Sequence, residues 1–330
     1  MHEIGAVRAL IASGKHLLLA GDEHLLASLP KGSWIGGTIP YFMTEEGGTH
    51  SKDRIFVTEM PAEVVKVEIR NYDERTISRV YEDIPERAVS FIMIPALSKT
   101  HSAFAINAPT FAGFASRPLV GWITGVDVAD IGKVSPRIFD GSTGESRMEG
   151  AVTMQVTLAA GKVAEVDILN LFVQGKGDSI RFEQDGFSIK EAVINGKRQS
   201  FVRYLKDRKI DTQLPLVADF AGAMINTSFQ NVDEAADAVS FYAPVFAGVD
   251  YRLGATEGDY VSSFQTQISR KPAAGLLFSC NCILNYLYAG LEGKRTGAIT
   301  GPVTFGEIAY QLLNQTMVYV RMMDDSPTDR

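Results

Sequence analysis

The sequence predicts an α+β fold of two lobes, in which each lobe is a mixed or mostly antiparallel β-sheet with packed helices. Segments with helical and strand-like apolar spacing are mixed along the whole chain, without a low-complexity linker or a short repeat. The middle of the chain has the clearest strand pattern, because apolar residues alternate with polar ones from Val152 to Leu158. A length of 330 residues is more than one compact core usually contains, so two lobes are expected.

The first part of the chain has the pattern of an α/β segment, in which apolar spacing changes between the helical and the strand period. Asp22 is a suitable N-cap for a short helix that ends by Leu29. The predicted elements are a helix over 3–11, a strand over 16–20, this short helix, strands over 33–39, within 54–69 and over 88–94, and a helix or irregular buried segment over 98–115.

The middle of the chain is expected to form a mostly antiparallel sheet. After the strand that ends at Leu158, a second strand is predicted over 163–173. Asp185-Gly186 lies between two short apolar segments, which is a typical pattern for a β-hairpin. From Phe201 onward the apolar spacing becomes helical. The lobe boundary is placed before this helix, so the predicted lobes are residues 1–190 and 191–330.

The last part of the chain alternates between strands and helices again. The predicted elements are a strand over 239–246, an extension over 248–253, a helix over 259–268, a strand over 276–279, a helix over 280–291 and strands over 303–308 and 316–322.

Composition and charge exclude several classes of protein. Hydrophobic residues make up 45% of the chain and charged residues 22%, which is ordinary for a folded protein and excludes a disordered or collagen-like chain. There are 32 Lys and Arg against 39 Asp and Glu, a net charge of -7. No basic surface of the kind that holds a phosphate backbone is therefore expected, which argues against nucleic acid as a partner.

A cytoplasmic location without membrane contact is expected. Cys280 and Cys282 are separated by one residue and are poorly placed for a structural disulfide, which fits a reducing compartment. The N-terminus lacks the pattern of a signal peptide. Two apolar segments, 103–126 and 272–291, approach the length of a membrane span. Prolines and glycines in the first, and asparagines in the second, favour buried core instead.

The end of the chain carries a specific pattern. The strand 276–280 ends in a cysteine, the segment 301–308 has the form Gly-x-x-x-x-Gly-Glu-Ile, and the triplet Asn314-Gln315-Thr316 follows. This order resembles the C-terminal signature of the FIST family of sensory domains. The similarity extends more loosely through Ile194–Lys197 and Ile35–Thr38, whereas the residues directly after Cys280 and a shortened N-terminal lobe depart from the family.

The resemblance implies a sensory module that binds a small molecule. FIST domains are attached to signalling outputs and are proposed to bind small molecules such as amino acids. The chain has no room for an output domain, so the resemblance implies a stand-alone sensor that signals through a separate protein partner. Its ligand is expected between the lobes, and it is expected to be an amino acid or a similar small polar metabolite.

The residues expected to bind this ligand carry backbone or side-chain hydrogen-bonding groups. A glycine pair at a strand end can present N–H groups to a carboxylate or phosphate, although close packing of two elements explains it equally simply. A buried carboxylate needs a partner, which is either a ligand ammonium or a group of the protein itself. The expected ligand-binding residues are Gly36, Gly37, Thr38, Cys280, Asn281, Gly306, Glu307, Asn314, Gln315 and Thr316.

An enzyme is the less favoured alternative. Cys280 is predicted at the start of a helix, where a lowered thiol pKa would make it a nucleophile, and Glu307 is a candidate acid or base. All five histidines lie in the first third of the chain, far in sequence from both. Cys280-x-Cys282 has no Cys or His companion for a metal, and neither a dinucleotide fingerprint nor a P-loop is present. No metal and no cofactor are therefore expected.

Overall fold

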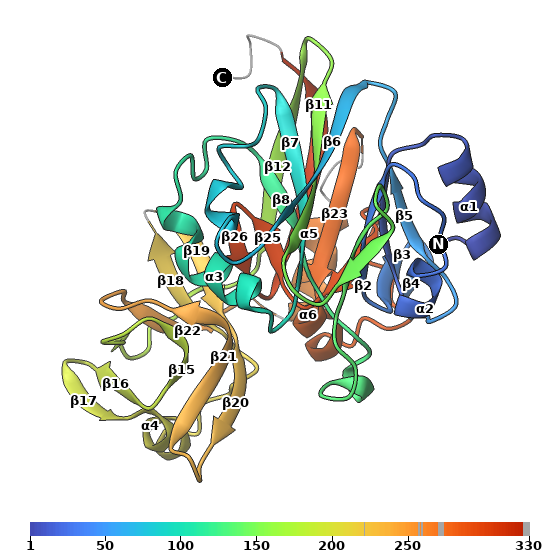
Figure 1. Ribbon diagram of the computed structural model, residues 1–330. Coiled ribbons are helices and arrows are strands. Elements are labelled where there is room, and N and C mark those ends of the chain that lie inside the picture. Colours follow the sequence, from blue (N-terminus) through green and yellow to red (C-terminus); the bar gives the residue numbers. More distant parts are fainter. Residues whose placement is uncertain (221, 257, 259, 270–273, 326–330) are drawn as a thin grey trace.

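The computed structural model describes residues 1–220, 222–256, 258, 260–269 and 274–325 (Figure 1). It confirms the predicted α+β class, because mixed and antiparallel sheets with packed helices form a large lobe and a smaller one. The small lobe lies at the lower left of Figure 1 and is built from the middle of the chain. The first and the last described residues, 1 and 325, lie on the large lobe.

Three sheets build the large lobe. Sheet I has the order β10 (Glu145–Arg147), β9 (Ile138–Asp140), β2 (Trp34–Thr38), β1 (Leu17–Gly21), β5 (Phe56–Glu59). Sheet II has the order β26 (Gln311–Leu313), β25 (Glu307–Ala309), β8 (Leu119–Thr124), β7 (Ala88–Pro95), β11 (Ala151–Leu158), β6 (Val64–Tyr72). Sheet III has the order β12 (Lys162–Asn170), β27 (Thr316–Asp324), β23 (Leu276–Cys282), β24 (Gly301–Thr304), β3 (Tyr41–Thr44), β4 (Gly47–His50).

Two sheets build the small lobe. Sheet IV has the order β17 (Lys197–Ser200), β16 (Glu191–Ile194), β14 (Ile180–Arg181), β22 (Tyr251–Ala255), β18 (Leu216–Phe220), β19 (Ala223–Thr227), and β13 (Val173–Gln174) also pairs with β22. Sheet V has the order β15 (Gly186–Ile189), β21 (Ala238–Val245), β20 (Phe229–Asp233). The helices of the two lobes are α1 (Ile4–Ala12), α2 (Glu23–Leu26), α3 (Lys99–Asn107), α4 (Phe201–Asp207), α5 (Tyr260–Ser269) and α6 (Ile283–Tyr288).

The main core lies between sheets II and III. Side chains alternate across a strand, so Phe91 of β7 points into this core, whereas Ile92 packs with α3 on the other face of sheet II. The Phe278 ring of β23 packs against Phe91 and Trp122, with centroids 5.4 and 5.7 Å away. The central strands β7 and β8 of sheet II are therefore buried on both faces, which explains why they are apolar almost throughout.

The chain leaves the large lobe after β12 and returns to it with α5, whose Phe264 and Ile268 belong to the main core. The small lobe has its own apolar core, formed by residues from Ile180 to Tyr251. Strands β23 to β27 then pair with β12, β8 and β3 of the large lobe. Strand pairing also crosses residue 190, since β14 pairs with β16. The predicted boundary at that residue stays a prediction.

Two local predictions are wrong. Asp185-Gly186 does not join a hairpin, because β15 pairs with β21 and the Asp185 carboxylate accepts a hydrogen bond from Ala247 N. The two-residue hairpin lies at Asn195-Gly196 instead, where φ values of 48° and 83° suit a turn of type I′ between β16 and β17. The strand predicted over 303–308 is split into β24 and β25.

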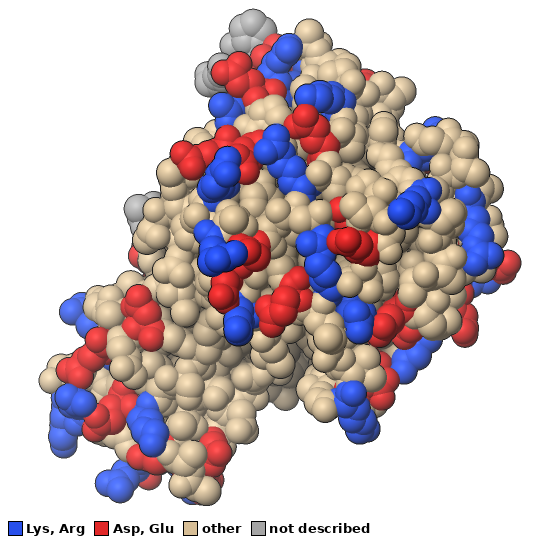
Figure 2. Space-filling view, in the orientation of Figure 1, with Lys and Arg blue, Asp and Glu red and all other residues tan. Residues whose placement is uncertain are grey.

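The surface charge and the helices are relevant to two expectations, namely that the protein has no nucleic-acid partner and no membrane contact. On the face shown in Figure 2, acidic and basic side chains are interspersed, without a large patch of either sign. Within the described residues, no helix combines the length and apolar character needed to cross a membrane.

Candidate functional site

The C-terminal motif residues converge on the carboxyl group of Glu307. Glu307 begins β25 and is completely buried, and Thr316 begins β27 beside it. Thr316 donates to Glu307 Oε2 from its hydroxyl at 2.7 Å and from its backbone N–H at 3.3 Å. Burial raises the pKa of Glu307 to about 8, although the bonds from Thr316 and the Cys282 thiol act in the opposite direction. Glu307 is therefore mainly protonated at neutral pH.

Cys280 is in a place that disfavours a thiolate. The strand β23 continues through Cys282, and α6 begins only at Ile283, so the prediction that Cys280 starts a helix is wrong. The Cys280 thiol donates to Gly121 O at 3.4 Å. Burial, followed by the nearby Glu307 and Cys282, raises the pKa of Cys280 well above its ordinary value. A nucleophilic cysteine needs the opposite environment.

Asn281 and Gly306 take part in hydrogen bonds within the protein. Asn281 Oδ1 accepts from Cys282 N at 2.8 Å and from Asn285 Nδ2 at 2.9 Å. The Thr304 hydroxyl lies 3.3 Å from Asn281 O and 3.1 Å from Gly306 O, and these two carbonyl oxygens share its single O–H donor. These groups stabilise the junction of β23 and β24.

Asn314 and Gln315 connect the two lobes. Asn226 Nδ2 of β19 donates to Asn314 O at 3.1 Å. The Ser228 hydroxyl donates to Gln315 Oε1 at 2.7 Å, and Gln315 Nε2 donates to Gln213 O at 3.0 Å. These residues were expected to meet a ligand between the lobes, but they are bonded to groups of the small lobe, and Asn314 Nδ2 donates to Leu313 O at 3.0 Å. Together with Glu307, Thr316 and Asn281 they form what we call the buried polar cluster.

The remaining candidates, Gly36 to Thr38, lie in sheet I. Strand β2 pairs with β1 on one side and β9 on the other, and Thr38 N donates to Arg137 O at 3.0 Å. A Cβ atom on Gly37 would lie 2.6 Å from Thr124 Cγ2 and 3.0 Å from Trp122 Nε1. The glycine therefore permits close packing of sheets I and II. In the described part of the chain, no hydrogen bond joins Gly36, Gly37 or Thr38 to the buried polar cluster.

The space beside Cys280 and Asn281 is very small. The cavity that these two residues line has a volume of about 10 Å³. One water molecule needs roughly 10–15 Å³ measured in this way. The space beside Cys280 and Asn281 therefore has no room for a metabolite in this conformation, and larger cavities lie elsewhere.

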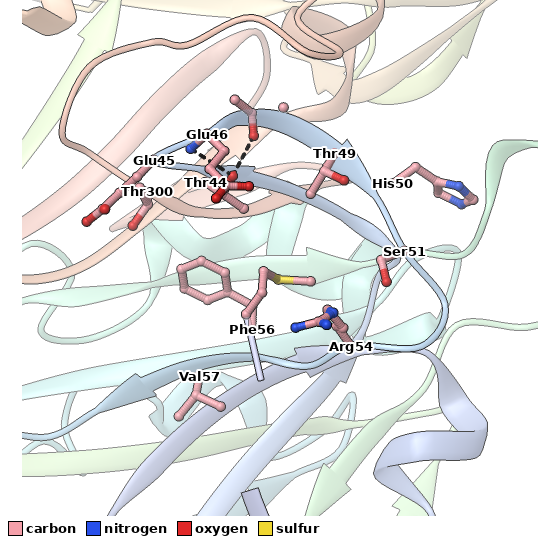
Figure 3. A pocket seen from close by; sticks show the side chains of 13 residues that line it. Thr44, Glu45, Glu46, Thr49, His50, Ser51, Arg54, Phe56, Val57 and Thr300 are labelled. Atoms are coloured by element: carbon pink, nitrogen blue, oxygen red, sulfur yellow. Dashed lines mark hydrogen bonds between the residues drawn. The ribbon is translucent and has the colours of Figure 1, made fainter. Parts of the chain in front are cut away.

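One of these larger cavities is a trough beside the β3–β4 hairpin, shown in Figure 3, with a volume of about 980 Å³. We call it the hairpin trough. The hairpin turn is ordered by Thr44, whose hydroxyl donates to Gly47 O at 2.8 Å and accepts from Glu46 N at 3.2 Å. Gly48 N donates to Lys294 O at 3.1 Å, which fixes the hairpin to the segment between α6 and β24. The trough is lined by Met1, Thr44 to Ser51, Arg54, Phe56, Val57 and Thr300.

The hairpin trough has charges of opposite sign at different places. In Figure 3, Glu45 and Glu46 lie together on one side, Arg54 lies toward the other, and the Phe56 ring lies between them. Arg54 is half exposed and pairs with Glu3 at 3.3 Å. No trough residue was predicted, because Glu45-Glu46-Gly47 is an ordinary solvent-facing turn when only the sequence is considered.

A second cavity, of about 390 Å³, lies where β1, β2 and β8 end. We call it the acidic cavity. Carboxylates line it, but they have partners in the protein: Glu23 pairs with Arg137 at 2.8 Å, and Asp22 caps α2. Thr38 is the sequence-predicted residue that lies on its wall. The lining residues are Asp22, Glu23, His24, Ala27, Thr38, Ile39, Pro40, Gly125, Val126, Asp127, Asp130, Val134 and Ser135.

An ion-pair cluster lies between the hairpin trough and the acidic cavity. Asp127 Oδ2 lies 3.0 Å from Lys52 Nζ and 3.1 Å from His50 Nε2, and Tyr41 Oη donates to Asp127 Oδ1 at 3.1 Å. Lys52 also contacts Asp130 at 2.9 Å. Burial opposes ionisation of Asp127, but hydrogen bonds from Ala129 N, Lys52 and Tyr41 outweigh it and lower its pKa to about 2.

The fold and these cavities define an α+β protein whose large lobe carries cavities that open to solvent. Residues 2–323 match the family of unknown function DUF6976, so the chain belongs to that family. No curated protein matches the chain. The resemblance to the FIST family stays a prediction.

Proposed function

We propose that this protein binds a small zwitterionic molecule, of the size of an amino acid or a short peptide, in the hairpin trough. The observation that carries the proposal is the distribution of charge in a cavity of about 980 Å³, with Glu45 and Glu46 apart from Arg54 and an aromatic floor between them. Ligand sites typically have volumes of about 300–1,000 Å³ and a few polar groups that fix orientation.

Each part of the trough suits one part of such a ligand. The Arg54 guanidinium has donors left over after its pair with the exposed Glu3 and can bind a carboxylate in bidentate fashion. Glu45 and Glu46 are exposed and suit an ammonium group. Phe56 and Val57 are partly buried and offer apolar contact to a side chain.

This site replaces the buried polar cluster as the proposed ligand position. The ligand-binding residues expected from the sequence are mostly buried within the protein, whereas the trough opens to solvent. A sensory role, in which binding is signalled to a separate protein partner in the cytoplasm, fits a binding protein without an obvious catalytic constellation and is part of the proposal.

The test is a binding screen with matched analogues. Thermal-shift measurements use the common amino acids and dipeptides, followed by calorimetry of each hit, because a ligand at a hundred times its Kd raises stability by about 2.7 kcal/mol. Each hit is compared with its N-acetyl and carboxamide derivatives, which lack one charge. We expect both derivatives to bind at least tenfold more weakly, a loss of about 1.4 kcal/mol.

Variants of the trough locate the site. Arg54→Gln is expected to weaken the zwitterion and the N-acetyl derivative but not the carboxamide, whose carboxylate is already absent. The double variant Glu45→Gln, Glu46→Gln is expected to weaken binding of the zwitterion and the carboxamide but not of the N-acetyl derivative, whose ammonium group is already absent. Glu149→Gln, a substitution outside the trough, is the control. The proposal would be contradicted by ligands whose affinity is the same for these variants and the parent, or by a screen in which no compound binds.

A further inference from the structure

The loop of residues 126–135, which we call the flap, joins β8 to the segment before β9. Its two ends meet at one residue: Gly125 N donates to Thr38 O at 2.8 Å, and Arg137 N donates to Thr38 Oγ1 at 2.8 Å. A loop whose ends lie together can move as a unit while its ends stay in place. In Figure 1 it projects from the large lobe below β2.

The flap makes little use of the apolar core. Within the described residues, the apolar clusters contain no member from 127–135. Val128, Ile131 and Val134 are instead exposed, by 37%, 54% and 44%. The fold therefore does not bury this loop by the hydrophobic effect, which holds most surface loops of this length to the body.

Polar contacts attach the flap to the β3–β4 hairpin. The Asp127 carboxylate accepts a hydrogen bond from Tyr41 Oη and forms ion-pair contacts with His50 and Lys52. Lys52 also forms an ion-pair contact with Asp130. Tyr41 Oη in turn accepts from Val128 N at 3.2 Å. These groups come from β3, from β4 and from the residue pair that follows it, so the flap is tied to an element that is distant in sequence.

The flap also forms one wall of the acidic cavity. Val126, Asp127, Asp130, Val134 and Ser135 line that cavity opposite Asp22 to Ala27 and Thr38 to Pro40. We infer that the flap is a movable cover of the acidic cavity and that Asp127, held by Lys52, His50 and Tyr41, is its latch. Release of the latch widens the entrance of this cavity for small molecules. The inference does not depend on binding in the hairpin trough.

The test measures flap opening directly in the full-length chain. Amide hydrogen exchange is followed by mass spectrometry in the parent and in Asp127→Asn, which keeps the size of the side chain but removes its charge. We expect amides of residues 126–135 to exchange at least tenfold faster in the variant, and amides of β7 and β11 to be unchanged. Asp130→Asn removes one Lys52 contact and is expected to have a smaller effect.

A thiol reporter measures access to the cavity. Val126 is 8% exposed and lines the cavity, and both natural cysteines are 1% exposed, so Val126→Cys introduces one accessible thiol when the flap opens. We expect its labelling by a maleimide to be at least tenfold faster when Asp127→Asn is added. Salt at 1 M screens partly exposed ion pairs, so it should accelerate labelling of the single Val126→Cys protein and change the double variant little.

Lys52→Met provides a second way to open the latch. It removes both lysine contacts while the hydrogen bonds of Asp127 to Tyr41 and Ala129 stay in place. If Asp127→Asn fails to fold, the same exchange and labelling are measured on Lys52→Met. Exchange and labelling within twofold of the parent, in a folded variant and without salt dependence, would overturn the inference.

Discussion

The buried polar cluster and the hairpin trough are opposite kinds of polar region. The cluster contains the residues that stand out in the sequence, and each of its side chains is hydrogen-bonded to another group of the protein, although Asn314 Oδ1 is buried without a partner among the described residues. The trough contains residues of an ordinary turn, and Glu45 and Glu46 face solvent. A polar motif near a strand end can thus serve the fold, while the groups that remain available for a ligand lie on a loop.

The largest expected effect concerns Glu307 and the stability of the cluster. Its folded pKa of about 8 lies above the ordinary value of 4.5, so the folded state holds more protons than the unfolded state between these pH values. Stability must then fall as pH rises from 4.5 to 8 and stay lower above it. At 1.36 kcal/mol per pH unit the loss is on the order of 5 kcal/mol.

Glu307→Gln tests this expectation. The amide resembles the protonated acid in shape and cannot ionise, so the variant should lack this loss. Urea unfolding at pH 5, 7 and 9 gives the difference in free energy of unfolding between variant and parent. We expect that difference to shift in favour of the variant by several kcal/mol from pH 5 to pH 9, and a constant difference would refute the assignment.

The second effect concerns the bonds between the lobes. Asn226 is completely buried, and its amide pairs with Asn170 at 3.0 Å and donates to Asn314 O. Asn226→Ala leaves these partners unsatisfied, so we expect a loss of about 2–3 kcal/mol, because each orphaned buried group costs about 1–3 kcal/mol. Ser228→Ala removes one bond to Gln315 and should cost less. Equal, small losses for both in urea unfolding would mean that the lobes are held by other contacts.

The fold was largely predictable because apolar spacing reports burial directly. The alternation from Val152 to Leu158 became β11, and the helix expected from Phe201 became α4, Phe201–Asp207. Asp22 caps α2, as its position before a short apolar segment indicated. The errors arose where contacts between residues distant in sequence determined the local structure. Cys280 lies in a strand because β23 pairs with β27 as far as Asn281, a partner that local sequence does not reveal.

The candidate site was predicted less well than the fold, for a physical reason. Motif residues such as Glu307, Asn314 and Thr316 are all brought together, but sequence does not show whether a polar group will bond to protein or to a ligand. That depends on whether space remains, and the space beside Asn281 is about 10 Å³. The trough depends on the approach of the β3–β4 hairpin to residues 293–294 and β5, which are distant in sequence.

A third, smaller effect distinguishes packing from binding at Gly37. A Cβ atom there would lie 2.6 Å from Thr124 Cγ2, so Gly37→Ala should cost about 1–3 kcal/mol through overpacking. Gly5→Ala in α1 meets nothing within 4 Å and should be neutral or stabilise the protein by up to about 1 kcal/mol. Thermal and urea unfolding compare the two. A Gly37→Ala protein as stable as the parent would show that the sheets separate easily here.

The smallest effect on stability is expected for variants of the hairpin trough, which should have the largest effect on ligand binding. Arg54→Gln and Glu45→Gln alter exposed side chains, and surface substitutions of this kind usually change stability by less than about 0.5 kcal/mol. Glu307→Gln should show the opposite behaviour, with a large pH-dependent change in stability and unchanged affinity for any trough ligand. Unfolding and calorimetry on the same three proteins therefore separate the two regions. A trough variant that loses several kcal/mol of stability would show that the hairpin charges support the fold, and the contrast between the regions would fail.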